Sequence, residues 1–277
     1  MTLVQAISIG HALDVDGASS GIVQQAFAHA VNLGIGGEMW TLLAADRPDL
    51  PFGIRTASHD FGCLDLRPGD RVGVRSGFVG IRSGSTCRVV DCRSAQRWQP
   101  APQDTFAPGV GSRLALVAAA ASDRAWHGAA PMAQAVRSAL GVPDALRTVL
   151  GCVVGHGPGS TPSGDDVLVG IFAVLTASRS GAAGAAAVRS LDQMMRPLLP
   201  GTTDISMQLL RQASRGLVGR AVHELICAIS SETNLQALRI AIQRVVETGV
   251  TSGADTCMGL LAFAPSYFLS DDERAAA

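Results

Sequence analysis

Twelve consecutive residues near the middle of the chain combine glycines, hydroxyls and two adjacent carboxylates. They read Gly155-His156-Gly157-Pro158-Gly159-Ser160-Thr161-Pro162-Ser163-Gly164-Asp165-Asp166 and are followed directly by an apolar run. The glycines and prolines predict a loop, and the apolar run predicts a buried helix. Hydroxyls and backbone N–H groups at a helix start bind phosphate or carboxylate groups, and Asp or His side chains act as acids and bases. The segment therefore predicts a site, with ordinary helix capping as the alternative.

The same pattern recurs near the end of the chain, where both copies read Ser-Gly-x-Asp-x-x-x-Gly before an apolar run. The equivalent pairs are Ser163 and Ser252, Gly164 and Gly253, Asp166 and Asp255, and Gly170 and Gly259. Glycines at this spacing let two helices approach closely, so we expect the copies to pack side by side as a pseudo-symmetric pair. We also expect spare N–H donors and hydroxyls of both helix starts to point into one cleft and bind an anion.

A third polar helix start lies between the two copies, at residues 200–213. Thr202 or Thr203 is placed to cap a helix, with Asp204 in its first turn and Ser206 one turn further on. We expect this start to border the same pocket as the two glycine motifs. Ordinary capping is again the alternative.

The pattern gives two groups of candidate site residues. The candidate catalytic residues are His156, Asp165 and Asp166. The candidate substrate-binding residues are Gly157, Gly159, Thr161, Ser163, Gly164, Thr203, Ser206, Thr251, Ser252, Gly253 and Asp255. No cofactor is certain from the sequence. Mg²⁺ is a candidate because Asp165, Asp166 and Asp255 supply the carboxylates that it prefers, although adjacent aspartates on a helix point in different directions.

Composition excludes several classes of function. The net charge is −1, and only 16% of the 277 residues are charged. This charge provides no basic surface for nucleic acid or an anionic membrane. All 22 positively charged residues are arginine, so lysine-dependent Schiff-base and Walker-type phosphate-loop chemistry is excluded.

Cysteine spacing and hydropathy indicate a cytoplasmic protein. The six cysteines show no CxxC spacing, and their surroundings predict reduced core residues. The amino terminus does not resemble a signal peptide, and every apolar run is shorter than a membrane span.

Periodicity changes near residue 110 and predicts two domains. Residues 1–110 contain short apolar runs separated by turn residues, which predicts strands, with one helix expected at residues 21–31. Residues 111–277 have helical periodicity and predict a bundle of roughly eight helices. We therefore expect an α+β chain, with a sandwich or barrel-like β-rich domain followed by an all-α helical bundle.

The motifs resemble those of a bacterial family. Gly-x-Gly-x-Gly-x-Thr-Pro-Ser-Gly-Asp-Asp, then Thr-Thr-x-Ile-Ser, then the second Ser-Gly-x-Asp-x-x-x-Gly are similar to the family that contains the AllH-type subunit of oxamate carbamoyltransferase. The resemblance implies a subunit that works with partner proteins in purine-derived nitrogen catabolism, where a carbamoyl group moves between oxamate and phosphate. It assigns no catalytic residues.

Two hypotheses of different classes follow. In the first, the chain is a carbamoyltransferase subunit that acts on oxamate or a related small carboxylate, with carbamoyl phosphate or phosphate bound at helix N-termini. In the second, it is a noncatalytic regulatory or assembly subunit whose motifs cap and pack helices. The partners expected are a small anionic metabolite and further protein subunits, without nucleic acid or membrane.

Overall fold

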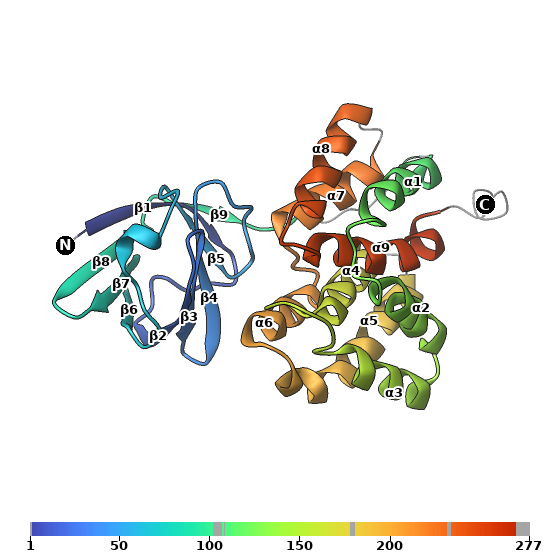
Figure 1. Cartoon of the computed structure of the whole chain (residues 1–277), viewed down its shortest axis with the longest axis horizontal. Coiled ribbons are helices and arrows are strands. Elements are labelled where there is room, and N and C mark those ends of the chain that lie inside the picture. Colours follow the sequence, from blue (N-terminus) through green and yellow to red (C-terminus); the bar gives the residue numbers. More distant parts are fainter. Residues whose placement is uncertain (1, 102–106, 108, 178–180, 232–233, 270–277) are drawn as a thin grey trace. The chain divides into compact units, whose positions relative to one another are not determined.

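The computed structural model describes residues 2–101, 107, 109–177, 181–231 and 234–269. The chain folds as two compact units, residues 1–100 and 101–277. Strands form the first unit and helices the second (Figure 1). None of the helices in the described ranges combines the length and the hydropathy of a membrane span.

The first unit is a barrel. Its strands are β1 (Thr2–Gly10), β2 (Ser19–Ala26), β3 (Ala30–Ile35), β4 (Glu38–Leu43), β5 (Gly53–Thr56), β6 (Arg71–Arg75), β7 (Phe78–Ser83), β8 (Thr86–Asp91) and β9 (Gln96–Trp98), with a 3₁₀ turn at Gly62–Leu64. Among the described residues they form one nine-stranded sheet in the order β5-β4-β3-β2-β6-β7-β8-β1-β9. β1 also pairs with β5, which closes eight of these strands into a barrel, while β9 runs parallel to the end of β1.

Alternating burial and tight turns explain the strands. In β6, Val72 and Val74 are buried while the residues between and beside them are exposed, and Val79 of β7 pairs with Val74. Such alternation fits a sheet with one packed face. Ser76 and Gly77 join β6 to β7 with φ of 52° and 80°, as a two-residue hairpin of type I′ requires.

The helix expected at residues 21–31 is wrong. β2 and β3 occupy this region and pair antiparallel, with Val23 opposite Leu33. Val23 is fully buried while Ile22 is exposed, so burial alternates along the chain as in a strand. The apolar spacing that suggested a helix is overridden by pairing of β2 with β3 and β6.

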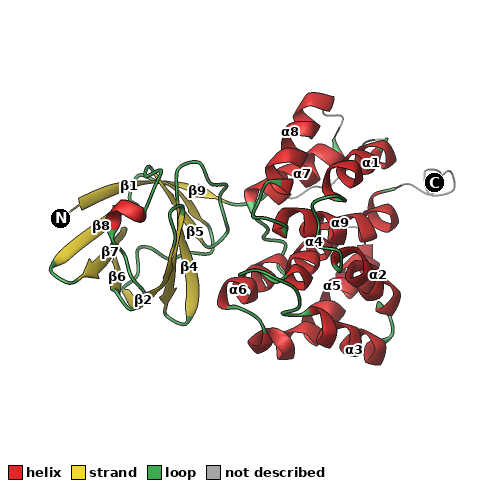
Figure 2. Ribbon diagram, in the orientation of Figure 1, coloured by secondary structure: helices red, strands yellow, loops and turns green. Residues whose placement is uncertain are grey.

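The predicted fold class needs correction in two respects. A sandwich is wrong because the β1–β5 pairing joins the two ends of the sheet, so that the barrel is closed. The helical unit has nine α-helices in its described part, where we expected roughly eight. An α+β chain with strands first and helices second is consistent with this arrangement (Figure 2).

The helical unit is organised around α4 and α9. Its elements are α1 (Val110–Ala121), α2 (Ala129–Ala139), α3 (Pro143–Val153), α4 (Ser163–Ala177), α5 (Gly181–Met195), a 3₁₀ helix η2 (Arg196–Gly201), α6 (Asp204–Ala213), α7 (Arg220–Ser230), α8 (Leu235–Val246) and α9 (Ser252–Phe268). Every residue of α4 from Ser163 to Leu175 is buried. A helix that is buried on all sides lies at the centre of a core, and α4 makes its most extensive contact with α9.

The expectation that the cysteines are core residues is correct only in part. Cys92 and Cys257 are buried, whereas Cys63 and Cys152 are exposed, and all six are free thiols. Cys152 lies on α3, whose buried residues are Leu146, Leu150 and Val153. Position 152 therefore faces away from the core, although its sequence neighbours are apolar.

Candidate functional site

The two copies of the motif begin adjacent helices. α4 starts at Ser163 and α9 at Ser252, and the Thr161 hydroxyl lies 2.8 Å from the Ser252 hydroxyl. Further along the pair, Gly170 lies against Thr256. These contacts follow the same order along both helices, so α4 and α9 are parallel and their amino-terminal ends lie together. The predicted side-by-side packing is confirmed.

Glycine is required where these helices touch. A Cβ at Gly170 would overlap the carbonyl oxygen of Thr256, and a Cβ at Gly259 would overlap that of Val167. The first glycine of each motif packs in the same way against the preceding helix, because a Cβ at Gly164 would overlap the last carbonyl of α3. The motif glycines therefore set the spacing of the central helices.

The loop before α4 has a backbone that only glycine adopts easily. Gly155, Gly157 and Gly159 have φ of 73°, 108° and 98°, in the left-handed region that disfavours side chains. The backbone N–H groups of Gly157, Gly159, Ser160 and Thr161 donate to no other described residue. These free donors are the groups in the motif that are best suited to an anion.

Most N–H groups at the helix starts are already used within the chain, contrary to our expectation of spare donors there. Gly164 N donates to His156 O at 2.8 Å, and Asp255 N donates to Thr251 O at 2.8 Å. Gly253 N likewise donates to the carbonyl oxygen of Thr248, at 3.0 Å. The turns before each helix supply these acceptors. The backbone N–H groups that remain for an anion are therefore those of the loop at residues 157–161.

Asp165 joins the glycine loop to the start of α6. Its Oδ1 accepts from Gly155 N at 2.9 Å, and its Oδ2 accepts a short hydrogen bond from the Thr202 hydroxyl. Burial raises the pKa of Asp165, while the hydrogen bonds from Thr202 and Gly155, and the nearby Ser206 hydroxyl, oppose the rise. With both oxygens occupied, Asp165 is suited to holding the loop in place.

The third helix start reaches the same place. Thr203 caps α6, because its Oγ1 accepts from Ser206 N at 3.2 Å, and the same hydroxyl donates to Ser160 O at 2.8 Å. Hydrogen bonds thus connect both α6 and α9 to the loop before α4. The three helix starts therefore lie together, and the pocket that we expected them to border stays a prediction.

Four buried polar side chains at this junction have an atom without a hydrogen-bond partner among the described residues. These atoms are Ser163 Oγ, Asp166 Oδ2, Ser206 Oγ and Asp255 Oδ2. Asp166 is 5% exposed, and the other three are fully buried. Because an unpaired buried polar group costs about 1 to 3 kcal/mol, their concentration here indicates a place for a bound polar molecule.

Asp166 is held in an environment that disfavours its charge. Burial raises the pKa of Asp166 well above its usual range, and the negative charges of Asp255 and Asp165 raise it further. The hydroxyls of Ser252 and Thr161 act in the opposite direction. Burial and the neighbouring carboxylates therefore favour the uncharged form of Asp166 more than they would for an exposed aspartate.

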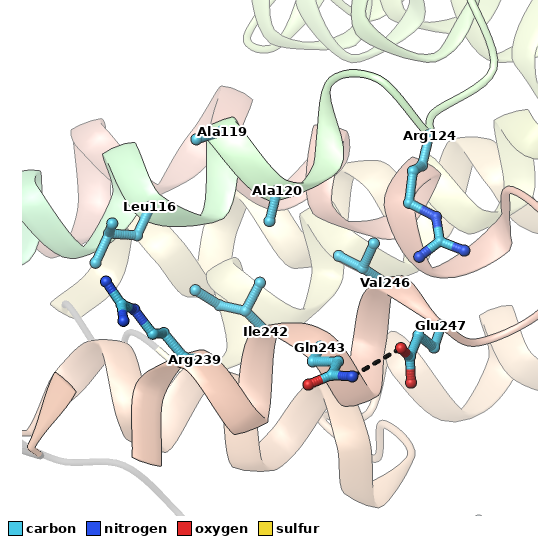
Figure 3. A pocket seen from close by; sticks show the side chains of 9 residues that line it. All are labelled: Leu116, Ala119, Ala120, Arg124, Arg239, Ile242, Gln243, Val246 and Glu247. Carbon is cyan, nitrogen blue, oxygen red and sulfur yellow. Dashed lines mark hydrogen bonds between the residues drawn. The ribbon is translucent and has the colours of Figure 1, made fainter. Parts of the chain in front are cut away.

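A groove of about 440 Å³ lies elsewhere in the unit, between α1 and α8 (Figure 3). Leu116, Ile242 and Val246 contribute apolar side chains, and Arg124 and Arg239 stand at opposite ends. None of the candidate site residues lines it. The groove is therefore the weaker candidate for the functional site.

Comparison with known protein families gives two matches. The AllH family N-terminal domain matches residues 5–96, which contain most of the barrel. The model described as oxamate carbamoyltransferase subunit AllH matches residues 153–264. The chain belongs to the AllH family. No solved structure matches it.

The second AllH match contains the whole predicted site. It begins at the last residue of α3, includes the glycine loop and the starts of α4, α6 and α9, and ends within α9. The convergent junction is thus part of what the AllH model describes.

Sequence reasoning missed Trp126, which lies outside that match. Its backbone N–H donates to Asp255 Oδ1 at 2.7 Å, and its ring lies 5.7 Å from the ring of exposed His156, centroid to centroid. Trp126 is half-buried and is the only tryptophan in the carboxy-terminal unit. The sequence feature that could have identified Trp126 is a single tryptophan within an alanine-rich segment.

The structure gives no support to Mg²⁺ as a cofactor of this AllH-family chain. Across the part of the chain that is described, no three His, Cys, Asp or Glu side chains are grouped as a metal site. Asp165 accepts from Thr202 and Gly155, and Asp255 accepts from Trp126. These carboxylates bind protein donors and are not arranged as a shared ligand set.

Replacing Asp166 with asparagine is expected to stabilise the protein at neutral pH by about 1 kcal/mol or more. The folded-state pKa is raised, so the folded protein retains a proton that the unfolded chain releases. Wild-type stability therefore falls as pH rises from the unfolded pKa, about 3.9, toward the folded one. Urea unfolding across this range measures the effect.

The stabilisation by Asp166→Asn should disappear at pH values below the unfolded pKa, where both states are protonated. The exposed Asp144 of α3 provides the control, since Asp144→Asn should follow wild type throughout. A constant difference between Asp166→Asn and wild type at every pH would contradict the argument.

The Thr161–Ser252 hydrogen bond is expected to couple the two helix starts by about 1 kcal/mol. Thr161→Val and Ser252→Ala each remove one hydroxyl of the 2.8 Å pair. The double variant should lose less stability than the sum of the single variants, because the second change finds no bond left to break. Strictly additive losses in urea unfolding would show that the contact contributes nothing.

Proposed function

We propose that this chain is a subunit of a carbamoyltransferase that acts on oxamate or a related small carboxylate bearing an amide or ureido group. The family description supplies the reaction class. The observation that carries the assignment to a site is the set of unpaired, buried polar atoms of Ser163, Asp166, Ser206 and Asp255 where three helix starts meet.

The chemistry of carbamoyl transfer suits these groups. A planar carbamoyl group moves between oxamate and phosphate, so the protein must hold an anion and a planar amide close together. The N–H groups of Gly157, Gly159, Ser160 and Thr161 are donors for the phosphate or carboxylate end. No covalent nucleophile is needed, because positioning and charge stabilisation provide much of the rate.

The predicted catalytic residues have different parts in this proposal. His156 is exposed within the loop and is free to move a proton at the edge of the site. Asp166 lies at the centre and offers an unpaired oxygen to the substrate. Asp165 positions the loop through Gly155 and does not contact substrate.

A noncatalytic role is the second candidate, and the packing of the motif favours it. Ser163 and Asp255 are fully buried, Thr203 caps a helix, and Asp165 is satisfied within the chain. In this case the partner subunits contain the catalytic groups, and this chain organises the assembly.

Calorimetric titration separates the two candidates. The purified chain, alone and with its partner subunits, would be titrated with oxamate, carbamoyl phosphate, phosphate and ATP. Binding of oxamate or carbamoyl phosphate that Asp166→Asn weakens at least tenfold, and that exposed Asp144→Asn leaves unchanged, supports the substrate site. Stable association with partners but no binding of any ligand to this chain, and full activity of the assembled Asp166→Asn enzyme, supports the noncatalytic role.

A further inference from the structure

Asp166 and Asp255 occupy equivalent positions in the two motifs, each three residues after the serine that begins its helix. Because α4 and α9 are parallel with their starts together, the two carboxyl groups belong to the same junction. Their charges interact, since Asp255 contributes to the electrostatic environment of Asp166. Each leaves its Oδ2 atom buried and without a partner among the described residues.

The orientation of this pair is fixed by the protein. Asp255 Oδ1 accepts from Trp126 N at 2.7 Å, so the remaining oxygen is held on the opposite side of the carboxyl group. Asp166 lies beside the Ser252 and Thr161 hydroxyls. The two Oδ2 atoms therefore remain for a bound molecule, and that of Asp255 cannot rotate away without breaking the bond from Trp126.

Unpaired carboxyl oxygens require hydrogen-bond donors. An –NH₂ group of a primary amide or carbamoyl compound has two N–H donors, whereas a carboxylate in the same place has none and adds a negative charge beside two acidic side chains. The hydroxyls of Ser163 and Ser206, also unpaired and fully buried, can donate to the adjoining carbonyl oxygen. The free N–H groups of the glycine loop remain for the anionic end.

We infer that Asp166 and Asp255 together bind the –NH₂ group of a primary amide, and so select an amide-bearing carboxylate such as oxamate over the corresponding dicarboxylate. The inference rests on the proposed function and adds to it the orientation of the substrate and the residues that determine specificity. A site that is built to pair with a substrate N–H discriminates strongly against an analogue lacking it, because the buried polar groups of the protein are then left unpaired.

The test compares oxamate with oxalate, which replaces the –NH₂ group by an oxygen, and with N,N-dimethyloxamate, which lacks N–H donors. Calorimetry on the chain, or on its complex with partner subunits, should show that oxamate binds at least about tenfold more tightly than either analogue. This difference in affinity is equivalent to about 1.4 kcal/mol. Asp255→Asn and, separately, Asp166→Asn each replace one acceptor oxygen by an amide donor. Each variant should bind oxamate more weakly and oxalate more tightly, which removes the preference.

Asp144→Asn, an exposed change on α3, should keep the wild-type preference, and circular dichroism would establish that each variant is folded. Equal affinity of the wild type for oxamate and oxalate, or an undiminished oxamate preference in both folded variants, would overturn the inference while leaving the proposed function in place. Failure of wild type to bind any of the three compounds, alone or assembled, would overturn the proposed function and the inference with it.

Discussion

Gly170→Ala is expected to destabilise the helical unit by about 3 kcal/mol or more. A Cβ at this position would overlap the carbonyl oxygen of Thr256 and lie 2.9 Å from Leu260 N. Both atoms belong to the backbone of α9, so no side-chain rotation can make room, and α4 and α9 would have to separate. Urea unfolding followed by far-ultraviolet circular dichroism measures the loss.

Gly151→Ala is the matched control, because it adds the same methyl group to a helix without a close neighbour. Gly151 lies on α3, is exposed, and a Cβ there would meet nothing within 4 Å. Alanine has the higher helix propensity, so this variant should be more stable than wild type by about 0.5 to 1 kcal/mol. Similar small effects of both substitutions would contradict the close approach of the central helices.

Asp165→Ala is expected to lower stability by about 2 kcal/mol or more and to abolish ligand binding. The change removes the acceptors of Gly155 N and the Thr202 hydroxyl, which together hold the glycine loop against the start of α6. Partial exposure of both donors lets water replace part of the loss. Thermal unfolding and calorimetric titration with oxamate measure the two effects.

Asp144→Ala provides the comparison for Asp165→Ala. Asp144 is exposed, and its contact with Arg147 is a surface ion pair at 3.5 Å, which contributes at most about 0.5 kcal/mol.

The Asp165→Ala variant should also be cleaved faster by proteases within residues 155–162, since its loop is no longer held by hydrogen bonds. If Asp165→Ala keeps wild-type stability, ligand binding and protease resistance, the hydrogen bonds of Asp165 with Gly155 and Thr202 do not hold the loop in place.

Asp166 and Asp255 place buried carboxyl groups where the helix starts converge. Replacing such groups by apolar side chains of similar size is often neutral or stabilising, and Asp166→Asn is expected to stabilise the fold. Asp166 therefore contributes little to folding by itself, whereas Asp255 also accepts the Trp126 N–H. Pairing of their Oδ2 atoms with the proposed ligand would give both carboxyl groups a role beyond folding.

Local pattern in the sequence was sufficient for the central part of the helical unit. The apolar run after Asp166 predicted a buried helix, and the glycine spacing shared with the second motif predicted that α4 and α9 pack together. Both follow from short-range rules, since side-chain periodicity and the absence of a Cβ act within one or two helical turns. The family resemblance, carried by the same residues, is likewise confirmed.

Contacts between distant residues decided the rest. Pairing of β1 with β5 closed the barrel. Pairing of β2 with β3 and β6 made a strand of residues whose apolar spacing suits a helix. The partners of Asp165, and the hydrogen bond from Trp126 to Asp255, join residues far apart in the chain. The sequence determined which residues begin the helices, because capping is local. Only the tertiary structure decided which of their polar atoms stay unpaired, because that depends on every neighbour the fold brings to them.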